Sequence, residues 1–315
     1  MVPRKAGWDT HGLPVELEVE KLLGLDGKEQ IEKYGLEPFI DHCKESVWKY
    51  KGMWEDFSKT VGFWADMDNP YVTYDNNFIE SEWWALKKIF DKGLLYKGFK
   101  IVPYCPRCGT PLSSHEVAQG YKSVKERSAV VRFKAVGEDA YFLAWTTTPW
   151  TLPSNVALCV NPDETYCKVN AADGYTYYMA DALLDKVLGK LATEEKPAYE
   201  IIEKYKGSEL EYKEYEPLFD CAKPICEKQN KKAYFVMCDG YVTMTDGTGI
   251  VHCAPAFGED DARVGRRYDL PFVQLVDGNG NMTAETDYAG KFVKEADPLV
   301  LADLDKKGLL FDAPK

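Results

Sequence analysis

The chain has 315 residues, of which 51 are acidic and 39 basic, so its formal net charge at pH 7 is −12. This acidic balance argues against a protein that binds nucleic acid through its overall charge, although a local basic patch is compatible with it. A hydrophobic content of 45% is enough for a folded core and argues against disorder. No apolar run is long enough to cross a membrane, and the N-terminus lacks the apolar region of a signal peptide. The number of cysteines, nine, is odd, which fits a reducing compartment better than a disulfide framework. We therefore expect a soluble, cytoplasmic protein with no membrane association.

Residues 1–98 are expected to be mainly helical. Two amphipathic stretches, Lys28–Trp54 and Asn76–Lys92, have the periodicity of helices, and Gly93 is a suitable stop after the second. Residues 99–127 are rich in cysteine, proline and glycine, and separate this helical part from the rest of the chain.

Residues 128–315 differ in character, because β-branched and aromatic runs dominate there. The predicted strands are Ala129–Phe133, Tyr141–Trp145, Thr165–Val169, Ala233–Met237, Gly249–His252 and Phe272–Val276. Helices are expected at Asp181–Leu191 and Pro298–Lys307, and Thr193–Tyr215 is expected to be a mobile or peripheral insertion. The predicted fold class is mixed α/β, with a β-rich, barrel-like module after a helical part of another domain.

Two segments of the β-rich part concentrate hydroxyl and turn-forming residues at a strand end. In the first, the apolar run Tyr141–Trp145 leads into Thr146, Thr147 and Thr148, and two prolines and Asn155 then interrupt regular structure. Loops at strand ends on a rigid scaffold are common places for functional sites.

The second segment, Gly247–Asp261, repeats this design. Two glycines precede the short strand-like pair Ile250–Val251, and His252 and an acidic cluster ending at Asp261 follow. If the two segments meet, they form a polar pocket of hydroxyls, one imidazole and one carboxylate, suited to a cationic ligand that forms hydrogen bonds.

A third pattern is the pair Cys105 and Cys108 in the stretch CPRCG, which has the spacing and turn chemistry of half a zinc ribbon. The remaining cysteines do not supply a second pair of this spacing. His115 is a candidate third ligand, for which a surface or helix-capping role is the simpler interpretation.

Five segments together resemble one known family. Trp145–Asn155 and Gly247–Asp261 are similar to the editing domain of the isoleucyl-tRNA synthetases, which are class I aminoacyl-tRNA synthetases. Three others agree in order: Gly7–Glu16 with the catalytic domain, Tyr104–Val117 with the zinc-bearing stem, and Asp297–Leu310 with the helix closing the editing insertion.

The resemblance implies an internal fragment with three parts. Residues 1–98 would be the helical part of a Rossmann-type catalytic domain, residues 99–127 a zinc-ribbon-like stem, and residues 128–315 the editing domain. The two family signatures that serve the ATP phosphates do not occur, so we expect no amino-acid activation, and Met1 is expected to be an internal methionine or the start of a truncated gene. ATP and magnesium would belong to the parent protein, and so would zinc, for which this chain carries half of the ligands.

The resemblance also implies roles for individual residues. The parent would charge tRNA(Ile) with isoleucine as a monomer, and this part would hydrolyse valyl-tRNA(Ile) or valyl-adenylate. Asp261 would hold the α-ammonium, with Glu259 and Asp260 as lesser candidates, and His252 would border the side-chain pocket and help to reject isoleucine. The residues matching those that line the pocket or bond the terminal adenosine or the ester are Thr146, Thr147, Thr148, Thr151 and Asn155.

Two positions bear on the branch of the family. Thr148 precedes Pro149-Trp150, where the related valyl and leucyl enzymes usually carry Arg-Pro, which favours the isoleucyl branch. Phe257 stands where some bacterial members have histidine, and Cys253 is expected to be a packed strand residue.

Several alternatives remain open at this stage. Asp9 matches the residue that would hold the ammonium of isoleucine in a complete synthetic site, but a helix N-cap explains it better here. The threonines could simply form strand-end hydrogen bonds, or Thr147 or Thr148 could form a relay with His252 and Asp261. A solvated surface explains two basic groups better than phosphate contact does: Lys122–Arg127, and Arg263 with Arg266 and Arg267. The chain could be a tRNA-binding module without chemistry, or a defective piece with four exposed tryptophans: Trp48, Trp54, Trp83 and Trp84.

Overall fold

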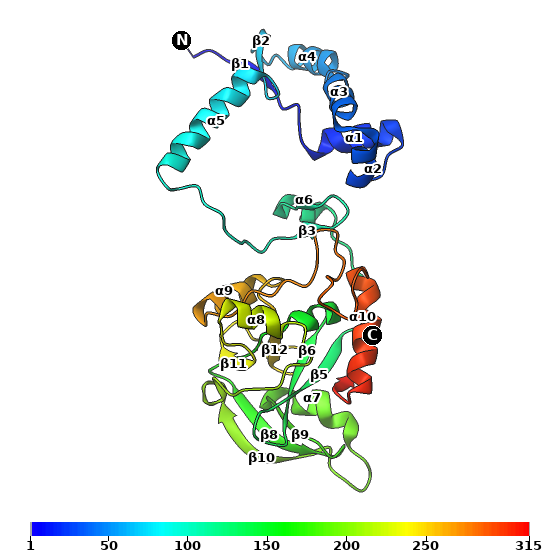
Figure 1. The fold of residues 1–315 in the computed structure, drawn as a ribbon, viewed down its shortest axis with the longest axis vertical. Helices are drawn as coiled ribbons and strands as arrows, with labels where there is room; N and C mark the ends of the chain where they lie inside the picture. Colours follow the sequence, from blue (N-terminus) through cyan, green and yellow to red (C-terminus); the bar gives the residue numbers. More distant parts are fainter. Residues whose placement is uncertain (1, 315) are drawn as a thin grey trace. The chain divides into compact units, whose positions relative to one another are not determined.

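A computed structural model describes residues 2–314, which form two compact units that meet in sequence between residues 99 and 100. The first unit is mainly helical, as the sequence predicts (Figure 1). Its elements are β1 (Lys5–Trp8), α1 (Leu13–Leu23), α2 (Lys28–Tyr34), α3 (Leu36–Ser46), α4 (Lys51–Thr60), β2 (Asp66–Val72) and α5 (Asn76–Asp91).

Two details of the first unit differ from the sequence-based expectation. The predicted helical stretch Lys28–Trp54 is divided into α2, α3 and the start of α4, because the chain turns at Gly35 and again near Tyr50. A parallel pair of strands, β1 and β2, was not predicted, since neither has a continuous apolar run.

The core of the first unit is small. Its buried cluster contains Val19, Ile31 and Phe39, one from each of α1, α2 and α3, whereas α4 and α5 bury no side chain. Trp54, Trp83 and Trp84 are exposed, as expected, with Trp83 at 72%. The expectation for Trp48 is wrong: its ring is half-buried, and its Nε1–H donates to the Tyr74 hydroxyl at 2.9 Å.

The second unit is built on a nine-stranded mixed sheet. The strand order is β10-β8-β9-β6-β12-β7-β11, with β5 also beside β6 and β13 beside β5. The strands are β5 (Ala129–Lys134), β6 (Tyr141–Thr146), β7 (Ala157–Val160), β8 (Thr165–Ala171), β9 (Thr176–Ala180), β10 (Tyr199–Lys206), β11 (Phe235–Cys238), β12 (Ile250–Cys253) and β13 (Leu310–Asp312). The two ends of this path, β10 and β11, do not pair within the described residues, so the sheet is open rather than a closed barrel. The predicted mixed α/β class is confirmed.

The second unit also contains short helices and a small hairpin outside this sheet. They are β3 (Tyr104–Cys105), β4 (Thr110–Pro111), α6 (Ser114–Gln119), η1 (Pro149–Ser154), η2 (Asp181–Leu183), α7 (Leu184–Leu188), η3 (Gly189–Leu191), η4 (Gly207–Leu210), α8 (Lys223–Gln229), α9 (Glu259–Arg267) and α10 (Val293–Lys306). The helix expected over Pro298–Lys307 begins five residues earlier, as α10, and packs against η1 and β13 (Figure 1).

Two predictions about the second unit are wrong. Thr193–Tyr215 is not an insertion outside the sheet, because it contains β10, an edge strand that pairs with β8 from Tyr199 to Lys206 with one irregularity after Ile201. Phe272–Val276 forms no strand: Val273 and Leu275 are buried in a cluster with Val264, whereas Gln274 between them is exposed, and the backbone of Val273 and Leu275 stays outside the sheet. Among the described residues, no helix has both the length and the apolar character needed to cross a membrane.

Candidate active site

The two polar segments meet because their strands are parallel neighbours. β6 and β12 pair in parallel, with Trp145 opposite Val251, and β12 is held on its other side by antiparallel pairing with β7. The carboxyl ends of β6 and β12 therefore lie at the same edge of the sheet, and the chain following each strand contributes to one pocket. Just before β12, only a glycine fits at Gly249, because a Cβ atom there would lie 2.3 Å from Cβ of Ala180 at the end of β9.

The pocket at this edge has a volume of about 240 Å³. Its walls combine hydroxyl, imidazole, carboxylate and apolar groups, and its lining residues are Trp145, Thr146, Thr147, Thr148, Thr151, Val251, His252, Ala254, Phe257 and Asp261. Six of the seven residues matched to this pocket line it, and the seventh, Asn155, is buried and is not among the lining residues. Asp9, which is matched to the synthetic site, lies in the first unit.

Hydrogen bonds within the threonine segment hold it in one conformation. The backbone N–H of Thr148 donates to Thr146 Oγ1 at 3.0 Å, and the Thr151 hydroxyl donates to the Thr148 carbonyl at 2.7 Å. Strand-end hydrogen bonding is thus part of their role. Thr147 differs from Thr146, Thr148 and Thr151, because it is exposed to solvent while also lining the pocket.

A carboxylate from the end of the chain supports the same segment. Asp297 Oδ1, on α10, accepts a hydrogen bond from the backbone N–H of Trp150 at 2.9 Å. Burial raises the pKa of this carboxyl group, and the bond from Trp150 opposes that rise. The indole of Trp150 in turn packs edge-on against Phe257, with ring centroids 5.0 Å apart, so that Phe257 forms an apolar wall of the pocket.

The His252 imidazole is neutral and fixed. Its side chain is only 7% exposed, and burial lowers its pKa to about 4, although the Asp261 carboxylate acts in the opposite direction. Its Nε2 lies 2.8 Å from Thr151 Oγ1, and its Nδ1 lies 3.5 Å from Asn155 Nδ2. The pocket therefore holds one negative charge, on Asp261, and no compensating imidazolium at neutral pH.

Asp261 is placed in the first turn of α9, where the helix dipole stabilises a negative charge. Its Oδ1 accepts a hydrogen bond from the Tyr241 hydroxyl at 3.1 Å, and its Oδ2 accepts one from the backbone N–H of Ala254 at 3.0 Å. Gly258 is required beside it, because a Cβ atom there would lie 2.8 Å from the carboxylate carbon. Neighbouring Asp260 is exposed and pairs instead with Arg263.

Sequence reasoning missed three residues that position this site. Tyr241 holds Asp261, Asp297 holds the turn after Thr148, and the Tyr215 hydroxyl donates to Asn155 Oδ1 at 2.6 Å. Each of the three is far in sequence from the residue to which it bonds: the separation ranges from 20 residues for Tyr241 and Asp261 to 147 for Asp297 and Trp150. Only Asp297 had a local signal, since it opens the last segment of the family resemblance. Cys253 is buried and its pKa is raised by burial, in agreement with a packed strand residue.

The predicted role of Asp9 as a helix cap is wrong. The N-cap position of α1 is occupied by Gly12, without a side-chain hydrogen bond. The Asp9 side chain is 80% exposed and lies 3.5 Å from the His11 imidazole.

Cys105 and Cys108 form a tight turn between β3 and β4. The backbone N–H of Cys108 donates to Cys105 Sγ at 3.4 Å and lowers the pKa of that thiol, and Gly109 N–H donates to the Cys105 carbonyl at 2.8 Å. His115 bonds to Gln119 instead of joining the thiols. Over residues 2–314, no group of three or more histidine, cysteine or acidic side chains could hold a metal ion. Two thiols do not make a complete zinc site.

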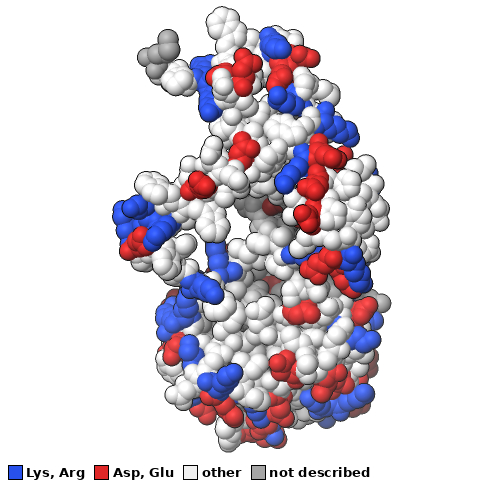
Figure 2. Space-filling model, turned by 45° about the horizontal axis from the view of Figure 1, so that its top comes forward, with Lys and Arg blue, Asp and Glu red and all other residues white. Residues whose placement is uncertain are grey.

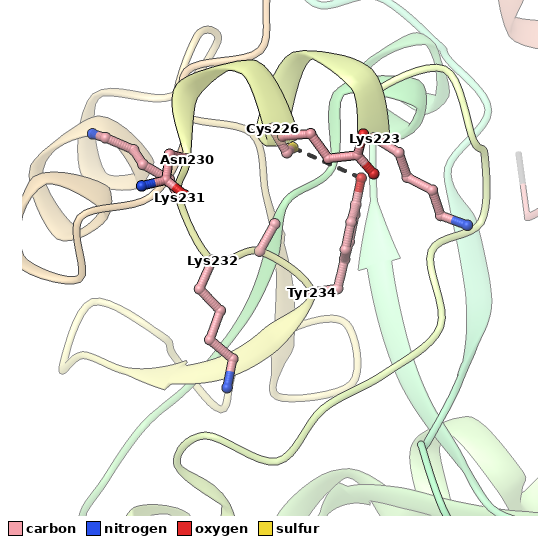
Figure 3. Close-up of a pocket in the computed structure, with 8 residues that line it drawn as sticks. Lys223, Cys226, Asn230, Lys231, Lys232 and Tyr234 are labelled. Carbon is pink, nitrogen blue, oxygen red and sulfur yellow. Dashed lines mark hydrogen bonds between the residues drawn. The ribbon is translucent and has the colours of Figure 1, made fainter.

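A second hollow, of about 580 Å³, lies beside α8 and carries three lysines (Figure 3). Each ammonium group is paired: Lys223 with Asp220 at 2.6 Å, Lys231 with Asp269 at 2.7 Å and Lys232 with Glu214 at 2.6 Å. Figure 3 shows the three side chains extending in different directions. This hollow therefore lacks the converging charges of an anion site.

The predicted basic group on α9 is largely neutralised. Arg263 and Arg267 both bind the carboxylate of Asp239, at 2.9 Å and 3.0 Å, and Arg263 also binds Asp260. On the face drawn in Figure 2, Lys and Arg side chains are interspersed with Asp and Glu side chains. These contacts agree with an ordinary solvated surface.

Comparison with known proteins identifies the family. The family model described as tRNA synthetases class I (I, L, M and V) matches residues 1–254. The chain is 55% identical over its whole length to isoleucine--tRNA ligase of Clostridium acetobutylicum and 56% identical to that of Clostridium kluyveri, and covers 29% of each.

The chain thus spans less than a third of the length of these relatives. Among solved structures, the editing domain of P. knowlesi cytosolic leucyl-tRNA synthetase is 15% identical, with a TM-score of 0.48, over 62% of this chain and 99% of that one. That likeness is too distant to bear on fold or function. The family match and the two sequence identities, by contrast, support one conclusion: this chain belongs to the class I tRNA synthetases.

Proposed function

We propose that the pocket at the ends of β6 and β12 is an editing site, which hydrolyses the ester of valyl-tRNA(Ile). The observation that carries this proposal is the convergence of the Asp261 carboxylate, the threonine hydroxyls and a neutral His252 in one pocket of about 240 Å³. The identity to isoleucine--tRNA ligases supports the choice of amino acid and tRNA.

Asp261 would bind the α-ammonium of the aminoacyl group. Its two oxygens are already oriented by Tyr241 and Ala254, so the carboxylate need not reorganise when the substrate arrives. Because His252 is neutral, no cation in the pocket competes with the ammonium for this charge.

The pocket would complement the selection made at a synthetic site. One methylene is worth only about 1–3 kcal/mol, a magnitude known from the selection of isoleucine against valine by this very family of synthetases. A second site that admits the smaller side chain and excludes the larger one supplies the missing accuracy. His252, Phe257 and Trp145 are the bulky groups that would set this size limit.

The chemistry asked of the protein is modest. Water adds to the ester carbonyl, the bond from the carbonyl carbon to the ribose oxygen breaks, and free valine and tRNA result. An aminoacyl ester is already activated, so holding the water and the carbonyl in place and stabilising the developing oxyanion contribute most of the acceleration. The hydroxyls of Thr146, Thr147 and Thr148 line the pocket and could donate to such an oxygen.

We assign the remaining functions to the longer parent protein. It would use ATP and magnesium to charge tRNA(Ile) with isoleucine as a cytoplasmic monomer. Residues 1–98 would belong to its Rossmann-type catalytic domain, in which Asp9 would hold the ammonium of isoleucine, and residues 99–127 to its stem. The thiols of Cys105 and Cys108 would need two further ligands from elsewhere to bind zinc, so no step of editing is assigned to that metal.

The test is deacylation of valyl-tRNA(Ile) by the chain, with isoleucyl-tRNA(Ile) as the competing substrate. Asp261→Asn should abolish hydrolysis of the valyl ester, whereas Asp260→Asn, a change of the adjacent carboxylate that is paired with Arg263, should retain it. Full activity of Asp261→Asn would refute the assignment. Binding of tRNA without turnover by the folded chain would favour a non-catalytic tRNA-binding module.

A further inference from the structure

The orientation of His252 is determined from two sides, by Thr151, which also lines the pocket, and by Asn155, which does not. Thr151 has a single hydroxyl proton, which it donates to the Thr148 carbonyl at 2.7 Å. The Thr151 oxygen can therefore only accept from His252 Nε2, 2.8 Å away, which places a proton on that nitrogen.

The other side of the ring faces the carboxamide of Asn155. The Ala157 carbonyl can only accept, so the Asn155 nitrogen must be the atom that faces it at 2.9 Å. The second N–H of the same amide points toward His252 Nδ1 at 3.5 Å and toward the Cys253 carbonyl at the same distance. A donor facing Nδ1 favours an unprotonated nitrogen there.

Tyr215 completes this arrangement from the strand-like segment before α8. Its hydroxyl donates to Asn155 Oδ1 at 2.6 Å, in a site where both side chains are buried. Burial raises the pKa of Tyr215 well above its usual value, so the hydroxyl keeps its proton and remains a donor. The two sides of the imidazole thus favour the same tautomer, and each contributes part of the preference.

We propose that Tyr215 and Asn155 are positioning residues, which together with Thr151 hold His252 in the neutral Nε2–H tautomer and so prevent it from acting as a general base. Asn155 faces Nδ1 of the histidine from outside the pocket and does not contact the substrate. His252 then serves as a rigid wall of the pocket, with its acceptor nitrogen turned toward Asn155 and its proton held by Thr151.

The groups that could titrate near this ring are few. Asp261, on α9, is the charged group that acts on it, and Tyr241 lies behind that carboxylate. The thiol of Cys253, the next residue of β12, has a pKa raised by burial and stays protonated. We therefore expect the tautomer to persist from pH 5 to pH 8.

The experiment is a long-range ¹H–¹⁵N correlation spectrum of the histidine-labelled chain over that pH range. The chain has four histidines, so a His252→Gln variant suffices to assign the His252 signals. The wild type should show Nε2 protonated and Nδ1 unprotonated throughout. A protonated Nδ1, or a doubly protonated ring at pH 7, would overturn the inference.

Variants test which residues impose the tautomer. Thr151→Val and Tyr215→Phe should each convert the single tautomer into an exchanging mixture, and Asn155→Asp should raise the pKa of the ring by placing an acceptor opposite Nδ1. The matched control is Tyr234→Phe, because Tyr234 stacks edge-on against Tyr215 but its hydroxyl lies near Cys226. Wild-type ¹⁵N shifts in folded Thr151→Val and Tyr215→Phe would refute the positioning roles.

The kinetic consequence rests on the proposed editing reaction, whereas the tautomer does not. Wild-type deacylation should show no ionisation of His252 between pH 5 and pH 8. A chain with the expected spectrum that does not hydrolyse valyl-tRNA would support this inference and contradict the proposed function. An inflection that disappears in His252→Gln would identify the histidine as a base and overturn the inference.

Discussion

Asp297 and Trp150 are joined by a hydrogen bond across 147 residues of sequence, at 2.9 Å from the carboxylate to the backbone N–H. The bond ties α10 to the turn that carries the pocket threonines. A helix that contributes no lining residue to the pocket thus holds one of its walls in place.

Asp297→Ala is expected to destabilise the second unit and to slow deacylation. The substitution leaves the Trp150 N–H without its acceptor in a half-buried position, which costs about 1–3 kcal/mol. Asp297→Asn is the matched control, because it retains an acceptor oxygen and removes a charge that burial disfavours. Urea unfolding followed by circular dichroism measures the difference, and equal stability of the two variants would contradict this role.

Gly258→Ala is expected to displace Asp261 without unfolding the chain. The new Cβ atom would lie 2.8 Å from the carboxylate carbon, so Asp261 must move and lose its bond with Ala254 or Tyr241. A displacement of this size at a reacting centre lowers the rate by about 10²-fold. Gly240→Ala is the control, since nothing lies within 4 Å of a Cβ atom there, and similar deacylation rates of the two variants would count against the role of Asp261.

Phe257→Ala is expected to weaken the discrimination between valine and isoleucine. The phenyl ring is a wall of the pocket and packs against Trp150, so its removal enlarges the space for a side chain. Hydrolysis of isoleucyl-tRNA(Ile) should then rise relative to that of the valyl ester by about tenfold or more, the range that one methylene produces. An unchanged ratio of kcat/KM values would show that another residue sets the size limit.

The stability of the second unit is expected to fall as the pH decreases from about 6.5 to about 4. Burial lowers the pKa of His252 from 6.5 to about 4, so in this interval the unfolded chain binds a proton that the folded chain does not. The stabilisation is complete above the unfolded pKa and is lost as pH falls toward the folded one, with a total of about 3 kcal/mol. Carboxylates such as Asp239 add a loss of the same sign only at lower pH, below their ordinary value of 3.8, because the hydrogen bond from Arg263 lowers the pKa of Asp239 in the folded chain.

The contribution of His252 is isolated by comparison with His252→Gln. The free energy of unfolding of this variant should vary less between pH 4 and pH 6.5 than that of the wild type. Parallel curves for the two proteins would mean that the histidine is not buried in its neutral form.

The strand ends at Trp145 and His252 could be predicted from the sequence, because an apolar run followed by hydroxyl or turn residues is a local pattern. The parallel pairing of β6 with β12 could not, since its partners are more than a hundred residues apart and nothing local specifies them. Asn155 shows the same limit: the sequence placed it in the pocket, whereas its contacts with Tyr215 and Ala157 place it beneath His252.

Apolar runs were also ambiguous where they did not form strands. Phe272–Val276 has a strand-like composition, but its apolar residues Val273 and Leu275 are buried without belonging to a strand. Conversely, the composition of β10 does not predict a strand, because it is rich in charged residues and an exposed edge strand needs few apolar side chains.

The long sequence separation between the two sides of the pocket also determines when it can form during synthesis. A ribosome releases the threonine segment first, α9 more than a hundred residues later and α10 last, and domains fold from the N-terminal side as they emerge. Until α10 has emerged, the turn at Trp150 lacks the carboxylate that fixes it. The pocket is therefore one of the last features of the second unit to mature, and a pulse-labelled nascent chain stalled before residue 293 should lack it.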